Sequence, residues 1–193
     1  MKCYFVILSN EKTAALIQNE HDIHLWEQLR NGNKAALAEL FELYFSQLYN
    51  YGRKICSDEE KVKDCIQDLF LEIWNQKNKM PLLSVKAYLT KALQYKLIRI
   101  NKKSQLIEAF DGNGNEFFDW SHETFIIKNE MDAEKVKKLL AAMQQLPKRQ
   151  QEIIYLKYYL NLSYEEICDV MNIQYQVARN QVSSAIKSLK KQD

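Results

Sequence analysis

The sequence predicts an all-α fold, in which two small helical domains are joined by an acidic linker. Glycine and proline are scarce, at 4 and 2 among 193 residues, whereas average usage would give about 23 together. Hairpins, β-sandwiches and barrels need glycine at their turns, so a mostly β fold is nearly excluded. Apolar residues make up 47% of the chain and recur at helical spacing, which indicates amphipathic helices with buried faces.

Charge divides the chain into four segments. The net charge of +2 hides sums of 0 for residues 1–20, +4 for 21–104, −6 for 105–133 and +4 for 134–193. The acidic segment also holds Gly112 and Gly114, which are typical of a linker. We therefore predict an N-terminal extension of poorly defined structure (1–20), a first domain (21–104), an acidic linker (105–133) and a second domain (134–193).

Three consecutive helices are expected in the first domain. Apolar residues recur at spacings of three and four from Leu37 to Ile55, which gives the first helix one apolar face. A capping box that starts at Ser57 and includes Glu60 begins the second helix. Ser84 is expected to cap the third, which extends to about residue 103.

The third helix has six basic residues and no acidic one between positions 86 and 103. Its candidate binding residues are Tyr88, Lys91, Tyr95, Arg99, Lys102 and Lys103, the first five of which share a face. Cations attract backbone phosphates, and tyrosine rings offer stacking surfaces to unpaired bases. This face suits single-stranded or melting DNA, although a solvated face with two half-buried tyrosines is an alternative.

The second helix has the opposite character, with an acidic strip and an aromatic residue at its end. The residues concerned are Asp64, Gln67, Asp68, Glu72 and Trp74. Such a strip can dock a basic helix of a partner protein. A purely solvated face is again the alternative.

The second domain contains a short helix, a tight turn and a longer final helix. Pro147 suits the start of a helix, and Lys148 and Arg149 directly after it would favour a nearby phosphate. Ser163 begins the short helix through a second capping box, and Asn172 suits the tight turn that follows. Lys148, Arg149 and Ser163 are candidate DNA-binding residues of this domain.

The final helix, from about residue 174 to 191, is predicted to turn a polar face outward. Its members are Gln176, Arg179, Asn180, Ser183 and Lys187. The order of elements is that of a helix-turn-helix. Arg can pair with guanine, and Asn or Gln with adenine, so this face predicts readout of duplex DNA.

Together these motifs resemble the extracytoplasmic-function sigma factors of the sigma-70 class, over about residues 23–190. The pattern of Asp64, Gln67, Phe70 and Trp74 is similar to the helix that docks on the clamp of RNA polymerase. The helix from Tyr88 looks like the segment that melts and reads the −10 element. Residues 146–147 and 162–167 match the second domain, and residues 179–183 resemble its −35-reading helix, in a form common among Bacteroidetes members. Asn and Asp, frequent in the −10 helix of the family, are replaced here by Tyr95 and Arg99.

The resemblance implies a non-enzymatic protein that binds core RNA polymerase and promoter DNA, with an anti-sigma factor as a further partner. The rival interpretations are a helix-turn-helix regulator that acts without polymerase, a hydrolase or metal enzyme, and a structural adaptor. The regulator would leave the first domain without a role.

Few residues suggest a metal or cofactor site. His21 and His24 could bind a metal weakly, but exposed polar roles are favoured. The cysteines form no Cys-x-x-Cys pair, so buried reduced thiols are favoured over zinc or disulfides. We expect no metal and no cofactor. No apolar run reaches the ~20 residues of a membrane span, and we expect a cytoplasmic protein.

Overall fold

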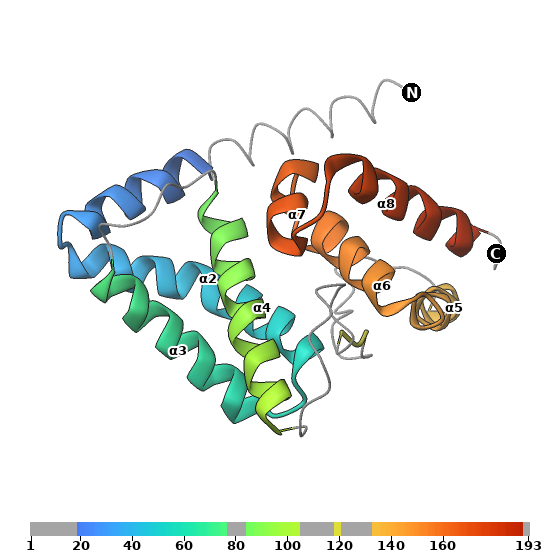
Figure 1. Ribbon diagram of the computed structural model, residues 1–193, viewed down its shortest axis with the longest axis horizontal. Helices are drawn as coiled ribbons and strands as arrows, with labels where there is room; N and C mark the ends of the chain where they lie inside the picture. The colour runs from blue at the N-terminus through green and yellow to red at the C-terminus, as the bar shows by residue number, and fades with distance from the viewer. Residues whose placement is uncertain (1–18, 77–83, 105–117, 121–132, 191–193) are drawn as a thin grey trace.

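The computed structural model describes residues 19–76, 84–104, 118–120 and 133–190, and every regular element in these ranges is a helix. The predicted all-α class is therefore confirmed. In the first domain, a helix over residues 19–30 is followed by α2 (Lys34–Ile55), α3 (Glu59–Asn75) and α4 (Val85–Ser104). These last three helices pack against one another (Figure 1). The sequence analysis did not predict the helix at residues 19–30, whose described part includes two residues before the predicted domain boundary.

Local signals explain where the helices of the first domain begin. Gly32 adopts a φ of 87° in the turn before α2, a conformation that favours glycine. Ser84 accepts a hydrogen bond from the Ala87 amide at 3.3 Å, as predicted for the start of α4. The prediction for α3 was wrong by one residue. Asp58, not Ser57, is the N-cap and accepts from the Lys61 amide at 3.2 Å, because a carboxylate is at least as good an acceptor there as a hydroxyl.

Gly52 lies in the middle of α2, where it allows the other helices to come close. A Cβ atom at this position would lie 2.7 Å from Cγ1 of Val62 and 3.2 Å from Cδ1 of Leu97. Side chains of α3 and α4 thus occupy the space that any larger residue would need. This glycine serves packing rather than chain reversal.

The second domain consists of α5 (Ala133–Gln144), α6 (Lys148–Ile154), the π-helical turn η2 (Tyr155–Tyr159), α7 (Tyr164–Met171) and α8 (Tyr175–Lys190). The helix that follows Pro147 starts as the regular helix α6, and its continuation widens into the π turn. The Leu160 amide donates to the Tyr155 carbonyl at 3.0 Å, five residues back. Asn161, at φ 54°, then ends the segment. The wider turn is accompanied by a stack of the Tyr155 and Tyr159 rings, 4.5 Å apart.

Residues 118–120 pack against both domains. The sequence predicted only an acidic linker here, without such contacts. Phe118 is fully buried and Trp120 is 3% exposed. Their rings contact Tyr155 of η2, with centroids 5.7 and 5.5 Å from its ring. The rest of the predicted linker up to residue 132, and residues 1–18 of the extension, lie outside the described residues.

Candidate nucleic-acid interface

Helices α7 and α8 form the predicted helix-turn-helix. The Glu166 amide donates to Oγ of Ser163 at 3.1 Å, and the Ser163 amide donates to the Glu166 carboxylate at 2.6 Å, so both halves of the capping box are present. Asn172 follows α7 with φ 52° and ψ 52°, the left-handed conformation that Asn tolerates in a tight turn. Ala178 and Val182 are buried and fix which side of α8 faces the domain.

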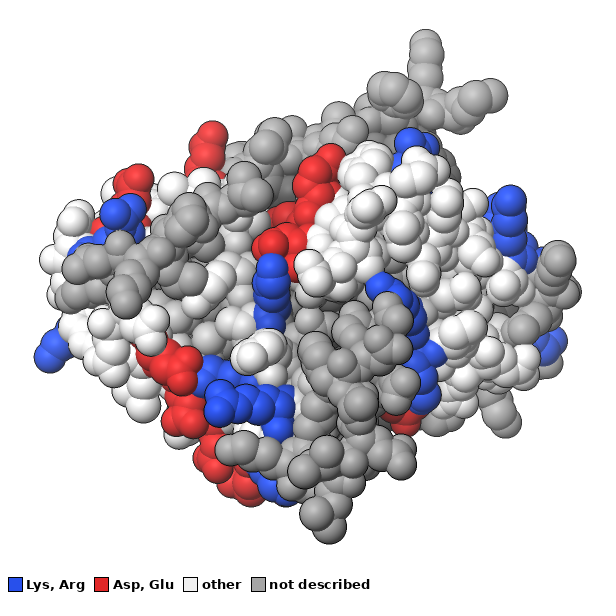
Figure 2. All heavy atoms as spheres, viewed as in Figure 1, with Lys and Arg blue, Asp and Glu red and all other residues white. Residues whose placement is uncertain are grey.

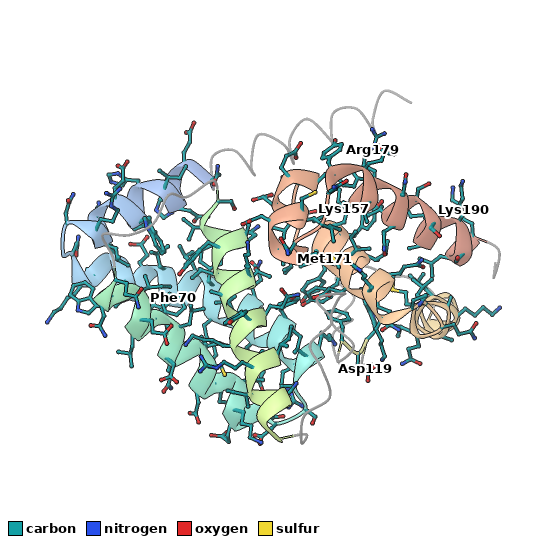
Figure 3. All side chains as sticks on the ribbon, viewed as in Figure 1. Phe70, Asp119, Lys157, Met171, Arg179 and Lys190 are labelled. Carbon is teal, nitrogen blue, oxygen red and sulfur yellow. The ribbon has the colours of Figure 1, made fainter. Side chains whose placement is uncertain are left out.

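The opposite side of α8 is exposed at every position that the sequence predicted. These residues are Gln176, Arg179, Asn180, Ser183 and Lys187. Arg179 projects from the helix into open space (Figure 3). Nε2 of Gln176 donates to Oδ1 of Asn180 at 3.1 Å, and this bond holds the two amides in one orientation. The face therefore presents directed donors and acceptors rather than a plain charged surface.

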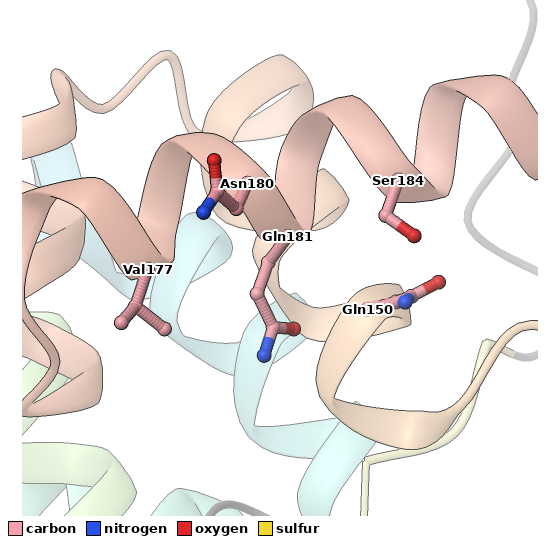
Figure 4. A pocket seen from close by; sticks show the side chains of 5 residues that line it. All are labelled: Gln150, Val177, Asn180, Gln181 and Ser184. Atoms are coloured by element: carbon pink, nitrogen blue, oxygen red, sulfur yellow. The ribbon is translucent and has the colours of Figure 1, made fainter.

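A shallow groove runs between the first turn of α6 and the middle of α8. It is lined by Gln150, Val177, Asn180, Gln181 and Ser184 (Figure 4). The sequence analysis missed Gln150, Gln181 and Ser184. Gln150 directly follows Lys148 and Arg149 in the first turn of α6.

Other predicted contacts of this domain are engaged within the protein. Lys148 is exposed, and its Nζ donates to Oδ1 of Asp119 at 2.8 Å. Arg149 is half-buried. The Ser163 hydroxyl already accepts the capping hydrogen bond, which leaves its own proton free to reach a phosphate.

Residues 137–189 match the family model described as sigma-70, region 4. This part of the chain is therefore similar to region 4 of the sigma-70 proteins. The match confirms the predicted resemblance to the sigma-70 class, in the part of the chain that holds the helix-turn-helix. A Bacteroidetes origin stays a prediction.

Solved structures of similar fold cover most of the chain, as two of them show. One is CnrH in complex with the cytosolic domain of CnrY, with 17% identity, 88% of this chain and 95% of that chain covered, and a TM-score of 0.60. The other is the sigma factor RpoE in complex with the anti-sigma factor NepR from Bartonella quintana, with 19% identity, 80% and 94% covered, and a TM-score of 0.52. At these identities the likeness establishes the fold. No curated protein matches the sequence.

The exposed acidic strip predicted on α3 is present, with one correction. Asp64, Gln67 and Asp68 are exposed. Phe70, in contrast, is 5% exposed and packs edge-on against Phe41 at 5.1 Å, so it supports the helix from the core side instead of contacting a partner. Leu71 is 59% exposed and was missed.

The signal for Leu71 was available in the sequence. It lies three, four and seven residues after Asp68, Gln67 and Asp64, so it shares their face. Trp74 is half-buried at the end of the strip. Glu72 is exposed, and Oε1 of its carboxylate accepts from Nζ of Lys96 on α4 at 2.5 Å. In Figure 2 acidic atoms follow the α3 edge of the first domain, with basic atoms beside them over α4.

The predicted face of α4 is divided into a covered and an open part. Tyr88 is half-buried and meets Trp26 edge-on at 5.6 Å, and Nζ of Lys91 pairs with Oδ1 of Asp169 on α7 at 2.6 Å. Tyr95 is 67% exposed, and Arg99 is exposed as well. The side chains of Lys102 and Lys103 lie outside the described residues.

Within the described parts of the chain, no group of three or more His, Cys, Asp or Glu side chains is placed to hold a metal ion. His21 and His24 are exposed, as expected. Cys56 and Cys65 are buried free thiols, and burial raises the pKa of Cys65 to about 11, which keeps it in the inert thiol form. None of the described helices is long and apolar enough to span a membrane.

Proposed function

We propose that this protein is a sigma factor of the extracytoplasmic-function type, which binds core RNA polymerase and directs transcription initiation from specific promoters. The observation that carries the proposal is the exposed, pre-oriented face of α8 inside the part of the chain that is similar to sigma-70 region 4. A protein with this role is not an enzyme and acts in the cytoplasm.

The second domain reads the −35 element in the major groove. The guanidinium of Arg179 can donate two hydrogen bonds to guanine, and the amides of Gln176 and Asn180 can pair with adenine. The hydrogen bond between those two amides, at 3.1 Å, restricts their rotamers before binding, so less side-chain conformational entropy is lost when they contact DNA. Lys187, Lys148 and Arg149 supply phosphate contacts that position the helix.

The first domain docks on polymerase through α3 and handles the −10 element through α4. Asp64 and Asp68 share an exposed face of α3 with Leu71, and apolar residues beside charged ones are usual in protein interfaces. On α4, the exposed ring of Tyr95 offers a stacking surface for an unpaired base next to the cation of Arg99.

An anti-sigma factor is a further proposed partner. The two structures of similar fold were each solved with a second protein, described for RpoE as an anti-sigma factor. Co-expression of the chain with a candidate cytosolic anti-sigma segment, followed by size-exclusion chromatography, tests this directly. Separate elution of the two proteins would exclude that candidate.

Arg179→Ala tests the −35 assignment. We expect promoter-specific initiation to weaken by about 1–3 kcal/mol, because one base contact is lost. Footprinting and run-off transcription measure the effect, and Lys190→Ala, an exposed cation at the end of the same helix, is the matched control. An unchanged footprint for Arg179→Ala would refute the assignment.

Asp64→Ala combined with Trp74→Ala tests the docking surface. The double variant should lose co-purification with core polymerase, while Glu42→Ala, an exposed acid on α2, should retain it. Circular dichroism checks that the half-buried Trp74 is not needed for folding. Normal co-purification of a folded double variant would contradict the α3 surface.

A further inference from the structure

The exposed face of α8 has two flanks with different chemistry. One flank carries the cation of Arg179, which is exposed. The other flank lines the shallow groove together with Gln150 from the first turn of α6. Its members project from the same side of the helix (Figure 4) and are Val177, Gln181 and Ser184. The two flanks can therefore contact different bases when α8 lies in a major groove.

Val177 is the apolar residue of the flank that lines the groove. Its side chain is 38% exposed, and it lies outside the hydrophobic core formed by the described residues. A valine side chain in a helix is held almost entirely in one rotamer, so its methyl groups keep a fixed position beside the groove. Val177 is therefore a pre-positioned apolar contact among polar neighbours.

Thymine is the base that offers an apolar group in the major groove. Its 5-methyl group is the apolar feature in the pattern of donors and acceptors that the four bases present there. Cytosine has no methyl group and presents an N4 amino donor instead, for which the Val177 side chain has no acceptor. Burial of one methyl group against an apolar side chain favours binding by about fourfold.

Asn180 places a second recognition group next to Val177. The two residues are three positions apart on α8, so their Cβ atoms lie about 5–6 Å from each other, and both line the groove. Oδ1 of Asn180 accepts from Nε2 of Gln176 at 3.1 Å, which leaves its own amide protons and a second lone pair to pair with adenine. Because successive bases are about 3.4 Å apart, Val177 and Asn180 can reach neighbouring base pairs.

We propose that Val177 is a specificity-determining residue, which recognises the 5-methyl group of a thymine in the −35 element, next to the base pair that Asn180 reads. The proposal rests on the proposed function and deepens it. The groove-lining flank of α8 selects thymine beside adenine, whereas the opposite flank selects guanine through Arg179.

Deoxyuridine substitution tests the methyl contact, because deoxyuridine pairs as thymidine does and lacks only the 5-methyl group. Each thymine of the −35 region, on both strands, is replaced in turn in a promoter duplex that the full chain selects with core polymerase. Competition binding of that complex gives the relative affinity of each duplex. We expect one replacement to weaken wild-type binding by about fourfold. With Val177→Ala, the same replacement should have an effect below about twofold, since the contact is already lost.

Leu43→Ala is the matched control for the valine variant. It shortens another exposed apolar side chain, 43% exposed on α2, and should keep the full effect of the deoxyuridine replacement. Circular dichroism checks that Val177→Ala folds as the wild type does. The proposal would be overturned if no replacement weakened wild-type binding, or if the wild type and folded Val177→Ala lost affinity equally at the same position.

Methylation of cytosine separates the methyl contact from the other differences between thymine and cytosine. Cytosine in place of the recognised thymine, paired with guanine, should weaken wild-type binding. 5-Methylcytosine at that position should bind about fourfold more tightly than cytosine for the wild type, and equally for Val177→Ala. Equal wild-type affinities for cytosine and 5-methylcytosine would exclude recognition of the methyl group.

These outcomes are separate from those of the proposed function. Transcription that depends on the protein, without a methyl effect coupled to Val177, would reject the thymine contact and keep the sigma-factor proposal. A coupled methyl effect in the binding of the chain alone to duplex DNA, without any dependent transcript, would do the reverse.

Discussion

Tyr51→Phe removes one hydroxyl from the buried contact between the domains and leaves the ring in place. Tyr51 is fully buried, and its hydroxyl donates to the Glu152 carboxylate at 2.7 Å. Burial first, and the charge of Glu152 second, raise the pKa of Tyr51 well above its usual value, so the phenol remains a donor. A hydrogen bond to a charged acceptor contributes about 1.5–3 kcal/mol. Glu152 keeps its bond from Gln94, so we expect a loss of about 2 kcal/mol.

Urea denaturation followed by circular dichroism measures this loss. With a slope of about 2 kcal/mol per molar urea, the midpoint should fall by about 1 M. Tyr95→Phe is the matched control, because it removes a hydroxyl from a side chain that is 67% exposed, and it should shift the midpoint little. Equal midpoints for the two variants would refute the role of the Tyr51 hydroxyl in joining the domains.

Other substitutions test the remaining structural claims. Gly52→Ala should lower the free energy of unfolding by about 1 kcal/mol, since overpacking of about 1–3 kcal/mol exceeds the helix-propensity gain of about 1 kcal/mol; a gain in urea resistance would contradict the close approach. Ser163→Ala should lower the free energy of unfolding by about 1 kcal/mol through loss of the cap. Exposed Ser46→Ala of α2 is the control for this variant and for Gly52→Ala. A loss for Ser163→Ala no larger than that of the control would count against the capping box. The pKa of Asp58 is lowered below 3.8, chiefly by the hydrogen bond from the Lys61 side chain. The ionised Asp58 carboxylate therefore stabilises the folded state above pH 3.8, and this stabilisation is lost as the pH falls through the lower pKa of the folded state. An NMR titration of the Asp58 carboxyl with a midpoint at or above 3.8 would rule that out.

The helices and the exposed polar face of α8 could be predicted because their signals are local. Pro147, Ser163 and Asn172 each act within one turn of their own position, and the outward residues of α8 follow from a period of 3.6. The position of Asp58 as N-cap was missed by one residue, because Ser57 and Asp58 are both good caps and the choice between them depends on how the chain enters α3.

The features that the sequence did not reveal depend on contacts between distant residues. No local pattern marks Glu152 as a buried residue of α6, and only its approach to Tyr51, 101 positions earlier, makes it an interface residue. Trp120 lies within the predicted acidic linker, where no neighbouring residue indicates that its ring is buried. Gly52 is required by neighbours on two other helices. None of these pairings has a periodic signature along the chain.

The central property of the proposed sigma factor is that it directs core RNA polymerase to promoters. Run-off transcription with purified core polymerase over a promoter library measures this in one step. We expect transcripts from a defined subset of promoters only when the protein is added, and their loss with Arg179→Ala. Absence of any dependent transcript, together with tight binding of the protein alone to duplex DNA, would contradict the account and favour a regulator that acts without polymerase.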